Sequence, residues 1–238
     1  MLIAFEDRPS DSPLVERVWR SRSEQAGSFH SMASCNWVMV VSRVNGRVFM
    51  TVRGPETRAS VAECPPDGEW IGIHFRLGSF MPEFPNRALR DRNDSTLPDL
   101  SGLSFWLAGS AWEYPSFDNA DVFVERLRSK GLLASDPYVR SALERRPGSS
   151  SRRTEQRHFL RASGITQVTA RQIERARRAA YCLQNGLPIL QVVHDMGYFD
   201  QAHLSRSMQH FIGRTPAQVA RGEGQLSLLY KPDELRLD

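Results

Sequence analysis

The strongest constraint on the fold of this chain is an internal repeat in its last hundred residues, where positions 49 apart carry matching residue types. The paired positions are Leu143 and Val192, Gly148 and Gly197, Ser151 and Asp200, Arg157 and Arg206, Phe159 and Met208, Gly164 and Gly213, and Thr166 and Thr215. Ser and Asp are favoured N-caps, because their side-chain oxygens accept hydrogen bonds from amides that the first helical turn leaves unpaired. Glycine adopts the left-handed conformation in which many helices end. Each copy therefore predicts a helix, a glycine turn and a capped second helix, which is a helix-turn-helix unit.

The second helix of the later copy is expected to have one apolar and one polar face. Leu204, Met208 and Phe211 recur at i, i+4 and i+7 and should face the core. The opposite face carries small and hydrogen-bonding side chains, namely Gln201, Ala202, Ser205 and Arg206, and His203 lies at its border. The corresponding face of the earlier copy carries Ser151, Arg152, Arg153, Gln156 and Arg157.

These side chains suit contact with base edges. Arginine can pair with guanine through two hydrogen bonds, and glutamine can do the same with adenine. A polar stripe is often no more than a solvated helix face, but its recurrence in a helix-turn-helix repeat favours DNA contact by these ten residues. For His203, a hydrogen bond to DNA and a structural bond to the preceding turn are both consistent with its place between the two stripes.

Two further positions in this region carry expectations. Glu155 stands where the later copy has Leu204, and because a buried unpaired carboxylate is too costly to persist, we expect it to be partly exposed or ion-paired. Residues 170–183 predict one continuous helix, about 20 Å long, that joins the two units as a rigid spacer. Its inward side chains are expected to be Ile173, Ala176, Ala180 and Leu183, and its outward ones Arg171, Glu174, Arg175 and Arg178.

The positive charge of the chain is concentrated in the same region. Residues 140–221 contain fourteen arginines and five acidic residues, an excess of nine positive charges. Because the whole chain has a net charge of +4, the remainder has an excess of five negative charges. A basic segment joined to an acidic one is typical of nucleic-acid binders, although a general preference for arginine over lysine contributes to the same signal.

Residues up to about 115 alternate in the manner of β-strands. Two apolar runs, 37–44 and 47–52, flank Asn45-Gly46, a dipeptide suited to the type I′ hairpin turn because both of its central residues need positive φ. A further run covers 70–77. From about residue 119 the apolar period becomes helical. There Asp136 and Pro137 predict a helix start, as cap and first helical residue.

These patterns predict an α+β chain of two domains. Residues 1–118 are expected to form an antiparallel sheet or partial barrel, and 119–222 an all-α DNA-binding domain in which a linker helix joins two helix-turn-helix motifs. Residues 223–238 are assigned to a C-terminal tail. The aromatic side chains of the first domain are consistent either with its core or with an effector pocket: Trp37, Phe75, Phe80, Phe84, Trp106 and Trp112.

Composition argues against several other classes of protein. No apolar run approaches the roughly 20 residues of a membrane span, and the first residues lack the pattern of a signal peptide, so we expect a cytoplasmic protein without a membrane partner. The cysteines Cys35, Cys64 and Cys182 form no CxxC pair and are odd in number, which argues against a disulfide framework. Together with His30 and His74 they are too scattered to predict a metal site, and we expect no cofactor.

Several runs in the last hundred residues resemble the AraC/XylS family of transcription regulators. They are Ser151 to Phe159, Arg171 to Ala179, Gly197 to Arg206, and Gly213 to Pro216. The resemblance covers about residues 119–222 and is most specific in the second unit. It implies a DNA-binding domain that clamps one face of double-stranded DNA, an N-terminal domain that senses a small-molecule effector or forms a homodimer, and RNA polymerase as a partner.

Three hypotheses follow. The first is a sequence-specific, non-enzymatic regulator of transcription, activating or repressing, with effector control through residues 1–118. The second is a small β-barrel enzyme fused to a DNA-binding domain, although repair enzymes of that kind carry clustered cysteines, which this chain lacks. The third is an architectural DNA binder, which would show little preference between DNA sequences.

Overall fold

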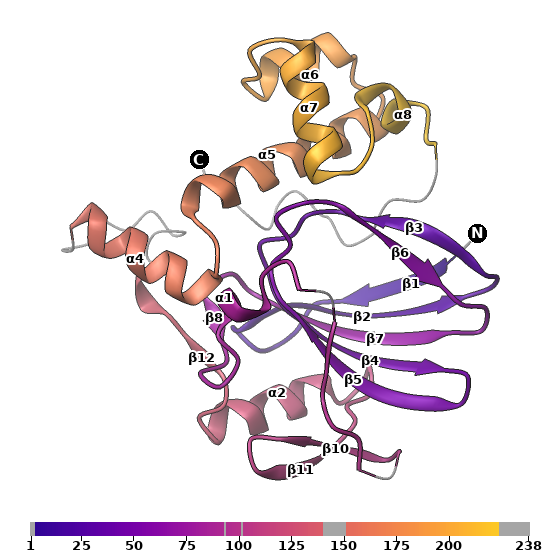
Figure 1. Cartoon of the computed structure of the whole chain (residues 1–238), viewed down its shortest axis with the longest axis vertical. Helices are drawn as coiled ribbons and strands as arrows, with labels where there is room; N and C mark the ends of the chain where they lie inside the picture. The colour runs from indigo at the N-terminus through magenta and orange to yellow at the C-terminus, as the bar shows by residue number, and fades with distance from the viewer. Residues whose placement is uncertain (1–2, 93, 101, 140–150, 224–238) are drawn as a thin grey trace. The chain divides into compact units, whose positions relative to one another are not determined.

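The computed structural model describes residues 3–92, 94–100, 102–139 and 151–223 (Figure 1). The chain forms two compact units, and both are assembled from segments that are discontinuous in sequence. The first unit contains 1–27, 36–55 and 64–166, and the second contains 28–35, 56–63 and 167–238. The second unit therefore combines the C-terminal helices with two short segments from the N-terminal half.

The first unit is built on a six-stranded antiparallel sheet. Its strand order is β1-β2-β7-β4-β5-β9. The bounds are β1 (Ile3–Arg8), β2 (Val15–Ser23), β4 (Val38–Val44), β5 (Arg47–Arg53), β7 (Glu69–Phe75) and β9 (Ser95–Thr96). The predicted hairpin is confirmed, because β4 and β5 pair across Asn45 and Gly46, whose φ angles are 51° and 73°. These positive values belong to the turn whose twist matches that of the strands.

Smaller elements complete the unit. They are β8 (Ser79–Phe80) with β12 (Ala134–Ser135), β10 (Ser104–Leu107) with β11 (Ser110–Glu113), and the helices α1 (Asn86–Leu89), α2 (Ala120–Ser129) and α4 (Arg152–Ser163). Helix α2 begins directly after Asn119, where the apolar period changes.

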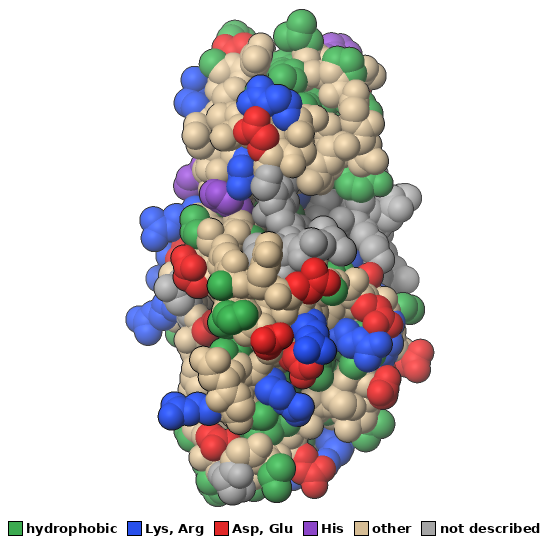
Figure 2. Space-filling view, turned by 90° about the vertical axis from the view of Figure 1, so that its right-hand side faces the viewer, with side chains coloured by type: hydrophobic (Ala, Val, Ile, Leu, Met, Phe, Trp, Pro, Cys, Tyr) green, Lys and Arg blue, Asp and Glu red, His purple; other side chains and the backbone are tan. Residues whose placement is uncertain are grey.

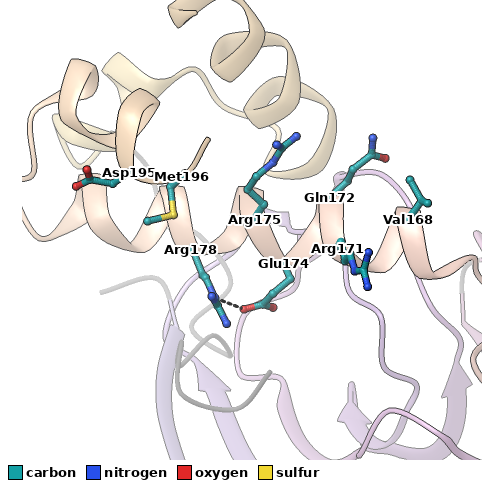
Figure 3. A pocket seen from close by; sticks show the side chains of 8 residues that line it. All are labelled: Val168, Arg171, Gln172, Glu174, Arg175, Arg178, Asp195 and Met196. Carbon is teal, nitrogen blue, oxygen red and sulfur yellow. Dashed lines mark hydrogen bonds and ion pairs between the residues drawn. The ribbon is translucent and has the colours of Figure 1, made fainter. Parts of the chain in front are cut away.

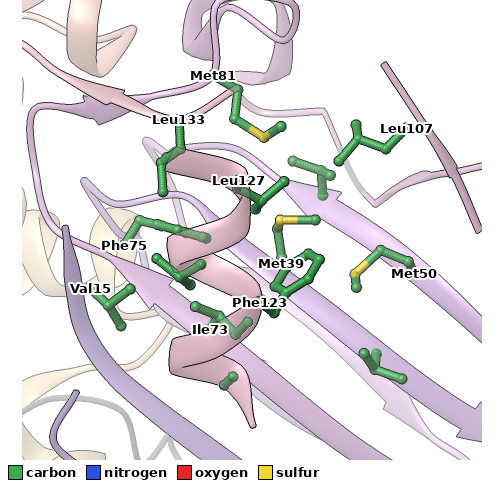
Figure 4. Packing of buried hydrophobic residues seen from close by; sticks show 14 of the residues in the cluster. Val15, Met39, Met50, Ile73, Phe75, Met81, Leu107, Phe123, Leu127 and Leu133 are labelled. Atoms are coloured by element: carbon green, nitrogen blue, oxygen red, sulfur yellow. The ribbon is translucent and has the colours of Figure 1, made fainter. Parts of the chain in front are cut away.

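The core of the first unit lies between the sheet and α2. Figure 4 shows Phe123 and Leu127 of the helix among the buried side chains of the strands, including Met39 and Ile73. Trp37 and Phe75 are also buried there, with ring centroids 3.8 Å apart. Because each Å² of buried apolar surface contributes about 25 cal/mol of stabilisation, this cluster is the main stabilising feature of the unit. The sequence is consistent with either a core position or an effector-pocket position for Trp37 and Phe75. The structure places both in the core.

The second unit contains four helices within the described residues: α5 (Gln167–Gln184), α6 (Ile189–Asp195), α7 (Gln201–Phe211) and α8 (Pro216–Ala220). Helix α5 packs against the other three. Its four predicted inward residues are all buried, and so are Leu204, Met208 and Phe211 of α7. The prediction that Glu174 points to solvent is wrong, because that residue is only 3% exposed; it nevertheless pairs with Arg178, whose Nε lies 3.1 Å from Oε1.

A two-stranded ribbon from the N-terminal half packs against the end of α7. Its strands are β3 (Gly27–Ser31) and β6 (Ser60–Cys64). The amide of Ala33 donates to the carbonyl oxygen of Phe211, and the amide of Ala59 donates to that of His210, both at 2.8 Å. The last four carbonyls of a helix have no partner within it. The ribbon therefore supplies two of the hydrogen bonds that α7 needs at its C-terminus.

Gly213 is the residue that lets the ribbon approach so closely. Its φ is +81°, and a Cβ there would lie 2.5 Å from Nδ1 of His30 and 3.1 Å from Cβ of Ala59. Burial and the charge of Arg214 lower the pKa of His30, so its imidazole is neutral at pH 7. The repeat identifies Gly213 as a helix end. The structure shows that the ribbon can also pack this closely only if position 213 has no side chain.

None of the helices in the part of the chain that the structure describes combines the length and the apolar character needed to cross a bilayer.

We predict that Gly213→Ala lowers the free energy of unfolding of the full chain more than Gly186→Ala does. Both glycines follow a helix at similar φ, +81° and +85°, but nothing lies within 4 Å of a Cβ at Gly186. Gly186→Ala should cost about 1–2 kcal/mol from backbone strain alone. Gly213→Ala should cost about 1–3 kcal/mol more, because the ribbon must move. Denaturant titration measures both losses, and equal losses would contradict the role given to the ribbon.

Candidate nucleic-acid interface

Helix α7 begins as the repeat predicts. Asp200 is its N-cap, and Oδ1 of Asp200 accepts from the amide of His203 at 2.6 Å. The preceding turn contains Gly197 at φ +65°. The amide of Phe199 donates to Nδ1 of His203 at 3.3 Å, so the structural bond considered for this histidine is present. An Nδ1 that accepts leaves the proton on Nε2, which can still act as a donor.

The turn before α7 is held from the linker helix. Arg175 of α5 donates to the carbonyl oxygen of Gly197 at 3.3 Å, and its guanidinium carbon lies 4.4 Å from the ring centroid of Tyr198. Tyr198 is buried, and its hydroxyl lies 3.2 Å from Oγ of Ser207. Burial raises the pKa of Tyr198, so the phenol remains protonated. Helix α5 therefore positions the turn before α7 as well as joining the two helix-turn-helix motifs.

The predicted polar face of α7 is open to solvent. Gln201, Ala202 and Arg206 are exposed, and His203 and Ser205 are half-buried. The opposite side of the helix carries the buried Leu204 and Met208, each at 0% exposure. All five predicted contact residues of this helix are thus at least partly accessible, and four lie within its first five positions. In helix-turn-helix proteins the N-terminal residues of the second helix approach the base edges.

Helix α4 has the same local construction. Oγ of Ser151 accepts from the amide of Thr154, and Gly164 ends the helix at φ +76°. Phe159 and Ala162 are buried, whereas its five predicted contact residues are exposed: Ser151, Arg152, Arg153, Gln156 and Arg157. Glu155 is half-buried where Leu204 is fully buried, in agreement with the expectation of partial exposure.

The surroundings of α4 differ from those of α7. Asn86, at the start of α1, donates from Nδ2 to the carbonyl oxygen of Ala162 at 2.6 Å. Nδ1 of His158 lies 2.9 Å from Oδ2 of Asp136. Oδ1 of the same carboxylate accepts from the amide of Tyr138, so Asp136 caps the helix that begins at Pro137, as predicted. Beyond Val139, that helix and the predicted turn at Gly148 lie outside the described residues. Helix α4 belongs to the first compact unit and α7 to the second.

A hollow of about 410 Å³ lies along the exposed side of α5 (Figure 3). Arg171, Arg175 and Arg178 line it, together with Glu174 and Asp195. One of its three arginines is paired with Glu174 and another holds the turn before α7. The sequence pattern predicts only that these arginines point outward from the spacer helix, and it does not indicate that Arg175 supports the turn before α7. Arg175 and Gly197 are 22 positions apart in the sequence, so no local pattern predicts that contact.

The first unit has a separate hollow of about 630 Å³, lined by β1, β2, β7 and residues 116–118. Phe5, Trp70 and Phe117 give it aromatic walls. Arg20 lies 4.7 Å from the ring centroid of Phe117 and pairs with Glu6 at 2.6 Å. Within the described ranges, no three His, Cys, Asp or Glu side chains are grouped so as to hold a metal ion.

Residues 149–222 match a family model described as a helix-turn-helix domain. This segment is a helix-turn-helix domain of the AraC/XylS type. The AraC/XylS-type domain includes α4 through α8, with both exposed polar faces, and it indicates a DNA-binding regulator of transcription. No curated protein and no solved structure matches the chain.

We predict that Asp200→Ala loosens the start of α7, whereas Asp200→Asn does not. Alanine removes the cap and should lower the local stability of the first turn by about 0.5–2 kcal/mol, but the amide oxygen of asparagine can still accept from His203. Hydrogen exchange of the α7 amides in the full chain measures the effect. Equal protection in the two variants would mean that the cap is not what holds this turn.

Proposed function

We propose that the chain reads specific sequences in double-stranded DNA, with α7 as the main reading helix and α4 as a second, and that it does so in the cytoplasm to regulate transcription. The observation that carries this proposal is the geometry of α7. Its start is capped, its turn is supported by Arg175, and its exposed face carries Gln201, Ala202 and Arg206 opposite a fully buried stripe. A rigid helix with these side chains at its N-terminal end suits the major groove.

The role of α4 is supported by the exposed residues Arg152, Arg153, Gln156 and Arg157. Three of the four are arginines, which contact phosphates as readily as guanine. Because α4 is bonded to α1 through Asn86, whereas α7 is bonded to the ribbon, the two helices are supported independently. We infer that α7 contributes more to sequence preference and α4 more to affinity.

Control by a small molecule is the finer part of the proposal. The aromatic hollow of the first unit suits a small ligand with a flat apolar part, since Phe5, Trp70 and Phe117 line it. Strands β2 and β7 both border this hollow. Along the chain, β2 is followed by β3, and β7 is preceded by β6. The loops at 33 and 59 then bond to the C-terminus of α7. A ligand that shifts β2 or β7 would thus act on the reading helix through covalent continuity.

An enzymatic function is not the one that this hollow favours, because its polar groups are largely engaged with each other, as in the pair of Arg20 and Glu6. A homodimer and RNA polymerase as partners remain predictions from the family resemblance.

Selection of sites from random duplex DNA by the full chain tests the proposal. We expect one preferred motif, and a steep loss of affinity with salt: for about six to ten neutralised phosphates, log K against log salt should slope at about −5 to −9. Repeating the selection with a cell metabolite extract tests effector control, which should change affinity. A specificity ratio near one would favour an architectural binder.

We predict that Arg206→Ala lowers affinity for the selected site by about 1–3 kcal/mol and relaxes the preference at one base pair. Arg221→Ala is the matched control, since Arg221 is an exposed arginine of the same unit that follows α8 and pairs with Glu223. Arg221→Ala removes the same positive charge, but at a position away from the exposed face of α7. Competition binding with all four base pairs at each position separates the two, and an unchanged base preference in Arg206→Ala would remove this residue from the reading face.

A further inference from the structure

Phe199, in the turn before α7, is 92% exposed. Among the large hydrophobic side chains of the described residues, the next most exposed are Leu103 at 79% and Leu190 at 72%. Hydrophobic side chains reach the surface of the unit that contains α6 and α7 in Figure 2. A single exposed apolar side chain is common in proteins and carries no meaning by itself. The position of Phe199 and the rigidity of its backbone nevertheless indicate a role for this side chain.

The backbone around Phe199 is held on both sides. Before it, the amide of Tyr198 donates to the carbonyl oxygen of Val193 at 2.9 Å, and the ring of Tyr198 occupies the interior. After it, Asp200 caps α7 through the amide of His203. The amide of Phe199 itself donates to Nδ1 of His203. Because the interior position is filled by Tyr198, the Phe199 ring has no place in the core of the unit.

Phe199 lies two residues before Gln201, at the end of α7 that enters the groove in the proposed function. The next three residues along the chain, Asp200, Gln201 and Ala202, are also exposed. An uncharged ring cannot form an ion pair with a phosphate. The one apolar group that a base pair presents in the major groove is the 5-methyl group of thymine. A rigidly presented aromatic ring at this end of the helix suits that group.

We propose that Phe199 contacts a thymine 5-methyl group at the edge of the site read by α7, and so sets a preference for thymine there. The inference rests on the proposed function, because it needs α7 to lie in the major groove. It assigns a specificity-determining role to a residue outside the polar stripe that the repeat identifies.

Replacement of single thymines by uracil in the selected site tests the proposal, because uracil lacks only the methyl group. With the full wild-type chain, one replacement next to the α7 contacts should weaken binding about fourfold, the effect expected for one buried methyl group. With Phe199→Ala, the thymine site should bind about as weakly as the uracil site, and the replacement should have no further effect. Phe199→Leu should retain part of the methyl dependence. The matched control is Leu103→Ala, because Leu103 is the next most exposed large hydrophobic residue and lies in the first unit; this variant should behave as wild type.

The outcomes separate the two proposals. If the full chain selects no motif, the proposed function fails. If it selects a motif that depends on Arg206 but uracil weakens wild type and Phe199→Ala equally, only the role of Phe199 is overturned. In that case, a loss of affinity of Phe199→Ala for both sites would indicate a wedge between base steps, and an unchanged affinity would place the ring outside the interface. A change of oligomeric state in Phe199→Ala, without a change in methyl dependence, would indicate contact with a second copy and would also overturn the proposal.

Discussion

The two main-chain hydrogen bonds from the ribbon to the end of α7 are the interaction on which the arrangement of the reading helix depends. Ala33 and Ala59 donate to the carbonyls of Phe211 and His210, so α7 is completed by chain that belongs to the N-terminal half. At its other end the helix is capped locally, by Asp200. A helix closed at both ends, with one face fully buried, has little freedom to change the direction of its exposed face. The direction of the exposed face of α7 is therefore a property of the whole second unit and not of a helix-turn-helix motif alone.

The sheet of the first unit and the ribbon of the second are consecutive along the chain. Strands β2 and β7 border the hollow of the first unit, and the two strands of the ribbon, β3 and β6, adjoin them along the chain. Buried apolar packing holds the sheet, whereas hydrogen bonds to backbone groups hold the ribbon against α7. The second kind of contact is easier to rearrange, since a carbonyl released from the ribbon can bond to water.

The turn before α7 shows how a few long-range contacts define a surface. Arg175 supports the turn through a carbonyl and an aromatic ring, Tyr198 fills the interior, and Phe199 is left outside. Residue type alone does not predict which of Tyr198 and Phe199 is buried, because Tyr and Phe have similar apolar bulk. The backbone bonds of the turn decide which ring is buried and which one is exposed.

The sequence by itself determined the features that repeat or act locally. The spacing of 49 located both capped helices, Ser151 and Asp200 marked their starts, Gly164 and Gly213 marked their ends, and Asn45-Gly46 specified the hairpin. Such signals survive in a sequence because each depends on a residue type within one turn of chain.

Only the tertiary structure decided that β3 and β6 join the second unit, that Asn86 bonds to the end of α4, and that Glu174 is buried. The ribbon bonds to α7 through backbone amides of two alanines, and a backbone amide is the same for almost every residue type. A contact of that kind leaves no mark in the sequence, and it becomes visible only when the chain is folded.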